Sequence, residues 1–214
     1  MRSGCGRTIL RRSIDAFEAH PLVSDLVVVL PEALMSEAAL HIGRTSRPCA
    51  VVAGGPRRQD SVRHGFAAVP PGDDVVLVHD AARPFVTMDV IDRVIAAARD
   101  AGAAVPALPA RDTVKHVAGG DGVVSGTIRR DEVWLAQTPQ GFRRAILASA
   151  IARGEQAAEA TDEASLVETG GGKVLLVMGD ERNVKITTAD DLAAARHALA
   201  PIPRVGTGYD LHRL

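Results

Sequence analysis

The sequence has little cysteine, few aromatic residues and almost no net charge, and each shortage excludes a class of function. Only Cys5 and Cys49 occur in 214 residues, which excludes a disulfide framework and a cysteine zinc cluster and favours a reducing cytoplasm. Aromatic residues make up 3%, too few for a surface that stacks single-stranded bases. A net charge of -1 argues against nucleic-acid and membrane-surface partners.

Long apolar runs are missing too. No stretch approaches the roughly 20 apolar residues that a membrane span needs. The first residues, MRSGCGRTIL, lack the apolar core of a signal peptide. These two observations argue for a chain that works away from the membrane.

Short apolar runs instead alternate with alanine-rich segments of helical pattern. Runs of Val and Leu that are apolar on both faces are typical of a sheet covered by helices. We therefore predict an α/β fold with a Rossmann-like open, mostly parallel sheet and flanking helices. The predicted strands are residues 25–30, 49–54, 74–80, 102–108, 133–138 and 173–179, and the predicted helices are residues 8–19, 32–42, 61–69, 87–100, 143–152, 162–169 and 189–199.

One region breaks this alternation. Residues 111–130, RDTVKHVAGGDGVVSGTIRR, have a glycine-rich centre between two β-branched segments. The pattern predicts a protruding β-hairpin arm, with residues 113–117 as the outward strand and 123–128 as the return strand. Because a bare hairpin is only marginally stable in water, we expect the arm to pack on another subunit.

Polar residues follow several of the predicted strands, where ligands bind in open α/β sheets. In VHDAARP, Asp80 and Arg83 follow the strand at 74–80. Asp80 is suited to a divalent metal or a ligand hydroxyl, and Arg83 to a phosphate. The alternative is that the two side chains pair with each other or cap the next helix.

Two further segments have both a binding and a structural interpretation. In GGPRRQDSV the bare Gly-Gly backbone admits a ligand, whereas Asp60 or Ser61 is a candidate helix N-cap. In TDEAS we expect Thr161 to cap a helix, with ligand contact as a second role. GGGK at 170–173 lacks the spacing of a phosphate-binding loop and predicts the end of a helix.

Together these segments resemble the 2-C-methyl-D-erythritol 4-phosphate cytidylyltransferases of the non-mevalonate isoprenoid pathway. The resemblance covers about residues 6–200 with the motifs in family order. The matching motifs are GRTIL (6–10), GGPRRQDSV (54–62), VHDAARP (78–84), RDTVK (111–115), TIRRDEVW (127–134), QTPQGF (137–142), TDEAS (161–165) and NVKITTADDL (183–192).

The resemblance implies a magnesium-dependent enzyme that transfers a cytidylyl group from CTP to methylerythritol phosphate. It implies that Arg130 and Lys185 position the substrate phosphate for attack. It also implies a homodimer with composite sites, because Arg130 lies at the base of the arm that crosses to the second subunit in the family. By position, Gly55, Ser61 and Ala81 match nucleotide contacts, and Asp80, Arg83, Thr113, Thr138 and Thr161 match the substrate pocket.

The two ends of the chain depart from a single-domain member of the family. Residues 201–214 follow the domain at 1–200 as a linker and the opening strand of a 2-C-methyl-D-erythritol 2,4-cyclodiphosphate synthase, as in a bifunctional fusion. Asp210 and His212 match the first two zinc ligands of that second family, without the third, so we expect no cyclase activity. At the other end we expect the family's first strand and glycine-rich CTP loop to be missing.

Two alternatives to the cytidylyltransferase activity remain open at this point. One is an inactive fragment that dimerises or binds substrate without turning over CTP, which the missing glycine-rich loop favours. The other is a nucleotidyltransferase that acts on another alditol phosphate, which the sheet pattern alone permits.

Overall fold

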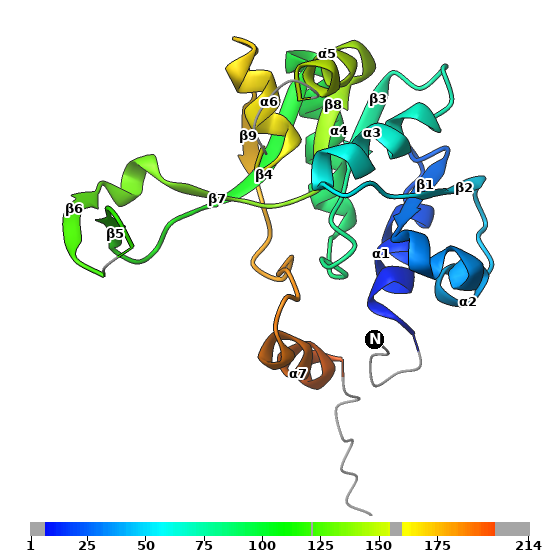
Figure 1. The fold of residues 1–214 in the computed structure, drawn as a ribbon, viewed down its shortest axis with the longest axis horizontal. Coiled ribbons are helices and arrows are strands. Elements are labelled where there is room, and N and C mark those ends of the chain that lie inside the picture. The colour runs from blue at the N-terminus through cyan, green and yellow to red at the C-terminus, as the bar shows by residue number, and fades with distance from the viewer. Residues whose placement is uncertain (1–6, 121, 155–159, 200–214) are drawn as a thin grey trace, which may run out of the picture.

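The computed structural model describes residues 7–120, 122–154 and 160–199 and shows an α/β fold, as predicted (Figure 1). Residues 201–214, with the predicted zinc ligands Asp210 and His212, lie outside the described residues. No helix in the described part of the chain is long and apolar enough to span a membrane. The strands are β1 (Leu26–Leu30), β2 (Cys49–Ala53), β3 (Val75–Val78), β4 (Ala103–Pro109), β5 (Val114–Val117), β6 (Val124–Ile128), β7 (Trp134–Ala136), β8 (Gln140–Arg143) and β9 (Leu175–Met178).

The larger sheet has five strands, with β3, β8, β4 and β7 in that order and β9 paired to β4. Strands β3, β4 and β9 run in one direction, while β7 and β8 are antiparallel to β4. Ala104 pairs with Gly141 of β8 and with Leu175 of β9, so β8 and β9 lie on opposite edges of β4. The sequence pattern did not predict β8, whose four residues follow a proline and directly precede a helix.

The smaller sheet consists of β1 and β2, which pair in parallel with Val28 opposite Val51. Among the described residues no strand pairing joins it to the larger sheet. A cleft of about 620 Å³ lies between the two sheets, lined by residues of β1 and β3 and by Phe17. The expected single sheet is therefore divided at this point into two hydrogen-bonded units.

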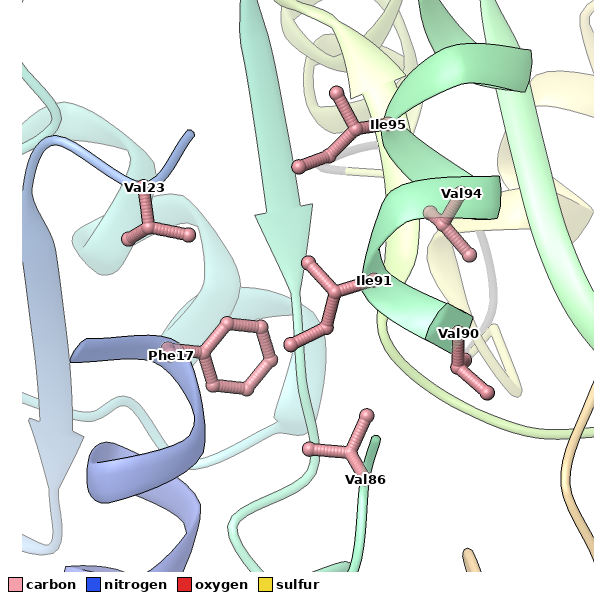
Figure 2. Packing of buried hydrophobic residues seen from close by; sticks show 7 residues of the cluster. All are labelled: Phe17, Val23, Val86, Val90, Ile91, Val94 and Ile95. Carbon is pink, nitrogen blue, oxygen red and sulfur yellow. The ribbon is translucent and has the colours of Figure 1, made fainter. Parts of the chain in front are cut away.

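Hydrophobic side chains connect the unit that contains the smaller sheet with the unit that contains the larger sheet. Phe17 from the N-terminal helix points toward Ile91 and Val86 of the larger unit (Figure 2). The cluster also contains Val90 and Val94, both fully buried. At this cluster the units meet through hydrophobic packing rather than strand pairing.

Helices pack against the strands of both units. The predicted helices are present, although the segment at 32–42 divides into a 3₁₀ helix and a short α-helix. The helices are α1 (Ile9–Glu18), η1 (Glu32–Glu37), α2 (Ala38–Ile42), α3 (Arg58–Ala67), α4 (Met88–Ala101), η2 (Arg130–Glu132), α5 (Arg144–Gly154), α6 (Glu163–Thr169) and α7 (Ala189–Ala198).

Two predicted helix caps were wrong. Helix α3 begins three residues before Ser61, its N-cap is Arg57, and the Asp60 carboxylate accepts from the Arg57 backbone N–H. Helix α6 is capped by Asp162 rather than Thr161, because the Asp162 side chain accepts from the backbone N–H of Ser165 at 2.9 Å. In both cases a nearby carboxylate captured the free backbone donors at the start of the helix.

The predicted arm is a β-hairpin of β5 and β6 that projects away from the larger sheet (Figure 1). Gly119, Gly120 and Gly122 at its tip have φ values of 86°, 74° and 79°. Glycine adopts this left-handed region without a steric penalty, which explains the glycine-rich centre of the segment.

Candidate active site

A carboxylate surrounded by three cationic side chains lies where β3 and β9 end. The Lys185 ammonium is 2.9 Å from Asp80 Oδ2, and the Arg83 Nε is 4.0 Å from the same oxygen. Arg58 Nη2 is 3.8 Å from Asp80 Oδ1. Burial alone would raise the pKa of Asp80, but the hydrogen bond and charge of Lys185, with Arg58 and Arg83, lower the pKa below its ordinary value. Asp80 is therefore ionised, and the group carries excess positive charge.

Arg83 acts as a brace between the two strand ends. Its Nη1 donates to the carbonyl of Asn183 at 2.8 Å, and its side chain is only 13% exposed. The backbone N–H of Ile186 donates to the Ala82 carbonyl at 2.8 Å, which ties the same two loops together. These contacts fix the loop that carries Lys185, so Arg83 holds the site together more than it faces a ligand.

Thr138 orients Asp80 through a partly buried chain of hydrogen bonds. Thr138 Oγ1 accepts from the Asp80 backbone N–H at 3.0 Å and lies 3.0 Å from His79 Nδ1. His79 Nε2 lies 3.1 Å from the Arg83 carbonyl, which can only accept, so this nitrogen carries the proton and Nδ1 accepts from Thr138. Burial lowers the pKa of His79 to about 4, which keeps the ring neutral in this chain.

The turn between β2 and α3 brings bare backbone to the same region. The Gly55 N–H donates to Ser61 Oγ at 3.0 Å. A Cβ on Gly54 would lie 2.8 Å from Ser61 Oγ, and a Cβ on Gly55 would lie 2.4 Å from the Cβ of Asp60. The Gly-Gly pair is therefore required by close packing of the turn against the first turn of α3.

Arg58 and Glu163 belong to this region and were not singled out from the sequence. Arg58, the first residue of α3, donates from Nη1 to Glu163 Oε1 at 2.7 Å. Burial raises the pKa of Glu163, an effect that the charge of Arg58 partly offsets. No signal in the sequence marks this pair, because its members are 105 residues apart. In each motif, neighbouring residues were singled out instead.

The structure does not bring every predicted residue into this group. Thr113 and Arg130 are exposed on the arm, where Arg130 Nη1 donates to the Arg111 carbonyl at 3.2 Å. Thr161 is exposed next to the start of α6. Ala81 is exposed and its carbonyl accepts from Ser13 Oγ at 2.9 Å, which connects the Asp80 loop to α1.

The described residues do not fit a magnesium ion held by protein ligands. They contain no group of three His, Cys, Asp or Glu side chains that could hold a metal. Asp80, the carboxylate at the centre of the group, is engaged by Lys185. What the arrangement can do is bind a phosphate, because three cationic side chains converge on one carboxylate and outnumber it in charge.

Comparison with known proteins points to one family. The sequence profile of 2-C-methyl-D-erythritol 4-phosphate cytidylyltransferase (IspD) matches residues 2–200. The Geobacter metallireducens protein of that name is 43% identical over 198 residues, covering 89% of this chain and 84% of the relative. The crystal structure of the Thermus thermophilus cytidylyltransferase superposes with a TM-score of 0.78 at 35% identity, covering 92% of this chain and 90% of that one.

Bifunctional proteins are also similar. The bifunctional enzyme IspD/IspF of Anaeromyxobacter sp. strain Fw109-5 is 49% identical over 211 residues, which is 97% of this chain but 54% of the relative. The chain thus spans about half the length of the bifunctional relatives that it matches. Profile, sequence and fold agree, and the chain belongs to the 2-C-methyl-D-erythritol 4-phosphate cytidylyltransferase family.

Proposed function

We propose that this chain transfers a cytidylyl group from CTP to 2-C-methyl-D-erythritol 4-phosphate, giving 4-diphosphocytidyl-2-C-methyl-D-erythritol and pyrophosphate. The substrate phosphate oxygen attacks the α-phosphorus of CTP, and the bond to the leaving pyrophosphate breaks. The observation that carries the proposal is the cationic group around Asp80 beside the Gly-Gly turn. Such a transfer depends mainly on positioning and charge neutralisation.

Lys185 is proposed to hold the attacking phosphate. An ammonium has three N–H donors, and one of them is directed to Asp80 Oδ2. The remaining donors are available to a phosphate, since the Lys185 side chain is 46% exposed. Asp80 thereby fixes the direction of the ammonium, and Arg83 and Thr138 fix the loops on either side of it.

The nucleotide is proposed to bind at the turn that carries Gly55 and Ser61 and at the loop that carries Ala81. Magnesium is proposed to arrive bound to CTP as part of the substrate, because the described side chains do not form a metal site of their own. Zinc is assigned only to a complete second domain, whose matching residues Asp210 and His212 lie outside the described residues.

We further propose a homodimer in which the arm of one subunit completes the site of the other. The arm and the strand after it expose apolar side chains that water does not favour: Val124 is 53% exposed, Trp134 40% and Leu135 57%. Arg130 opens η2, which follows β6 in the chain, and the hairpin of β5 and β6 projects away from the larger sheet (Figure 1). Burying this segment against a second copy would bring Arg130 to the partner's Asp80 group.

The activity is tested by pyrophosphate release from CTP, Mg²⁺ and methylerythritol phosphate with this 214-residue chain. Release that requires methylerythritol phosphate, and that ribitol phosphate does not support, is the expected result. Release with ribitol phosphate instead would favour the alternative substrate. Binding of both substrates without release would favour a chain that binds but does not turn over CTP.

The composite site is tested by mixing two inactive variants, Lys185→Ala and Arg130→Ala, co-expressed with separable tags. A mixed dimer then has one site with both wild-type side chains and one with neither. Random pairing should therefore restore about a quarter of wild-type activity. If both side chains came from the same chain, the mixture would stay inactive, and the dimer role of the arm would be abandoned.

A further inference from the structure

A carboxylate with almost no contact to solvent is held behind the cationic group. The Glu163 side chain is 2% exposed, and its Oε1 accepts from Arg58 Nη1 at 2.7 Å. Its other oxygen, Oε2, is buried with no hydrogen-bond partner among the described residues. Removing a carboxylate from water costs free energy that one hydrogen bond does not fully return. The helix dipole favours an acid in the first turn of α6, but an exposed acid would serve the dipole without this cost of burial.

The start of α6 is held in place from several sides, which fixes Glu163. Gln140 of β8 donates from Nε2 to Asp162 Oδ2 at 2.7 Å and accepts from the backbone N–H of Ala164 at 3.2 Å. Gln59, the neighbour of Arg58, accepts from the backbone N–H of Ala160 at 3.1 Å. These hydrogen bonds connect α3, β8 and α6, and they fix the backbone at both Arg58 and Glu163.

The other edge of the Arg58 guanidinium faces the site. Nη2 lies 3.8 Å from Asp80 Oδ1, beyond hydrogen-bond distance, and the side chain is 33% exposed. Lys185 contacts the second oxygen of the same carboxylate. A planar guanidinium with one edge fixed and one edge open is suited to a phosphate, because it offers parallel N–H donors without further loss of side-chain freedom.

We propose that Arg58 binds a phosphate group of the substrates and that Glu163 is a positioning residue that acts through Arg58. This inference rests on the proposed cytidylyl transfer and adds a cation to its site. Arg58 belongs to the turn assigned to the nucleotide and faces the Asp80 group assigned to the second substrate. Its ligand is a phosphate of CTP or the phosphate of methylerythritol phosphate, and titration with each substrate distinguishes the two.

The test is calorimetric titration of the 214-residue chain with CTP, methylerythritol phosphate and inorganic phosphate. Arg58→Met alone leaves a buried charge unpaired and can unfold the protein, so the decisive variant is Arg58→Met/Glu163→Gln, in which no buried charge remains in the pair. We expect its dissociation constant for at least one of the two substrates to rise about 10- to 100-fold, the effect of losing a hydrogen bond to a charged group. Arg93→Met on α4 is the control, since Arg93 binds the Met178 carbonyl instead.

The outcomes separate the inference from the proposed function. A rise for CTP alone assigns Arg58 to the nucleotide phosphate, and a rise for methylerythritol phosphate alone assigns it to the second substrate. Unchanged affinity for both, in a wild type that binds both, overturns the inference and leaves the proposed function standing. If the wild type binds inorganic phosphate but neither substrate, and the double variant loses that binding, the phosphate site at Arg58 stands and the proposed function is overturned. No binding of any of the three by the wild type overturns both.

The positioning role of Glu163 is tested by Glu163→Gln alone. Glutamine keeps the shape and an acceptor for Arg58 but removes the charge that fixes the guanidinium. We expect the affinity that depends on Arg58 to fall about fivefold while the melting temperature stays the same or rises, because a buried charge has been removed. Unchanged affinity, or a fall in affinity that accompanies a fall in melting temperature, overturns this role.

Discussion

Two regions supply the site, and they are organised over different distances along the chain. The turn that opens α3 is held by local contacts: Gly55 donates to Ser61 six residues later, and Arg57 pairs with Asp60 three residues later. The strand-end group is held by remote contacts: Arg83 donates to the Asn183 carbonyl 100 residues away, and Asp80 donates to Thr138 58 residues away. The first region can form as soon as its helix forms, whereas the second exists only when the larger sheet is complete.

The two regions also belong to different hydrogen-bonded units. The turn follows β2 of the small sheet, and Asp80 and Lys185 follow β3 and β9 of the large one. The units are connected by the packing of Phe17 on α4 and by the contact of its ring with His79, whose centroid is 4.8 Å away. The site therefore depends on the interface between the two units, which includes the cleft. Substitutions in each region test the two contributions separately.

The largest effect is expected in the remote region, on activity. Lys185→Ala removes the ammonium proposed to hold the attacking phosphate and should lower turnover about 10²- to 10³-fold. The free energy of unfolding should change little, because the side chain is 46% exposed. Steady-state pyrophosphate release measures the effect, with Lys173→Ala, an exposed lysine before β9, as the control. Equal losses in both variants would mean that Lys185 has no specific role.

The next effect is expected in the local region, on stability. Gly55→Ala places a methyl group 2.4 Å from the Cβ of Asp60 and 3.3 Å from its backbone carbon. The turn cannot move away without displacing the start of α3, so we expect a loss of about 1–3 kcal/mol in the free energy of unfolding. Urea denaturation measures it. Gly72→Ala, where nothing lies within 4 Å of the added methyl, should change stability by less than about 0.5 kcal/mol; similar losses at both positions would contradict the packing argument.

The most gradual effect is a pH dependence of stability at the contact between the units. Burial lowers the pKa of His79 from 6.5 to about 4, so the unfolded chain binds more protons than the folded one between these values. The contribution of the neutral ring is fully present above pH 6.5 and is lost as the pH falls toward 4, by about 2 kcal/mol at pH 5.

Urea denaturation of the wild type and His79→Asn at pH 7.5 and pH 5 measures this contribution. Asparagine can still donate to the Arg83 carbonyl but does not titrate. Acidic groups elsewhere contribute equally to both proteins, so the difference between the two pH slopes isolates His79. Parallel slopes would show that the ring becomes protonated without cost and is not buried as described.

The sequence determined the features that depend on neighbours in the chain. Alternating apolar and alanine-rich segments predicted the α/β fold, and the glycines of residues 118–122 predicted the hairpin arm. Asp80 was singled out because it follows a predicted strand, and Lys185 was identified through the family resemblance; the structure places the two in contact. Strand β8 escaped prediction because its apolar run is short. The caps were predicted wrongly because α3 begins earlier than the pattern indicates, with Arg57 as its N-cap, and because Asp162 rather than its neighbour Thr161 accepts the hydrogen bond at the start of α6.

Only the tertiary structure decided what remote residues do to one another. It showed that Arg83 braces two loops, that His79 is held neutral between Thr138 and the Arg83 carbonyl, and that Glu163 lies behind Arg58. It also divided the strands into two sheets with a cleft between them. The physical reason is the same in each case: burial, charge and hydrogen-bond partners depend on which segments pack together, and segments 100 residues apart leave no periodic signal in the sequence.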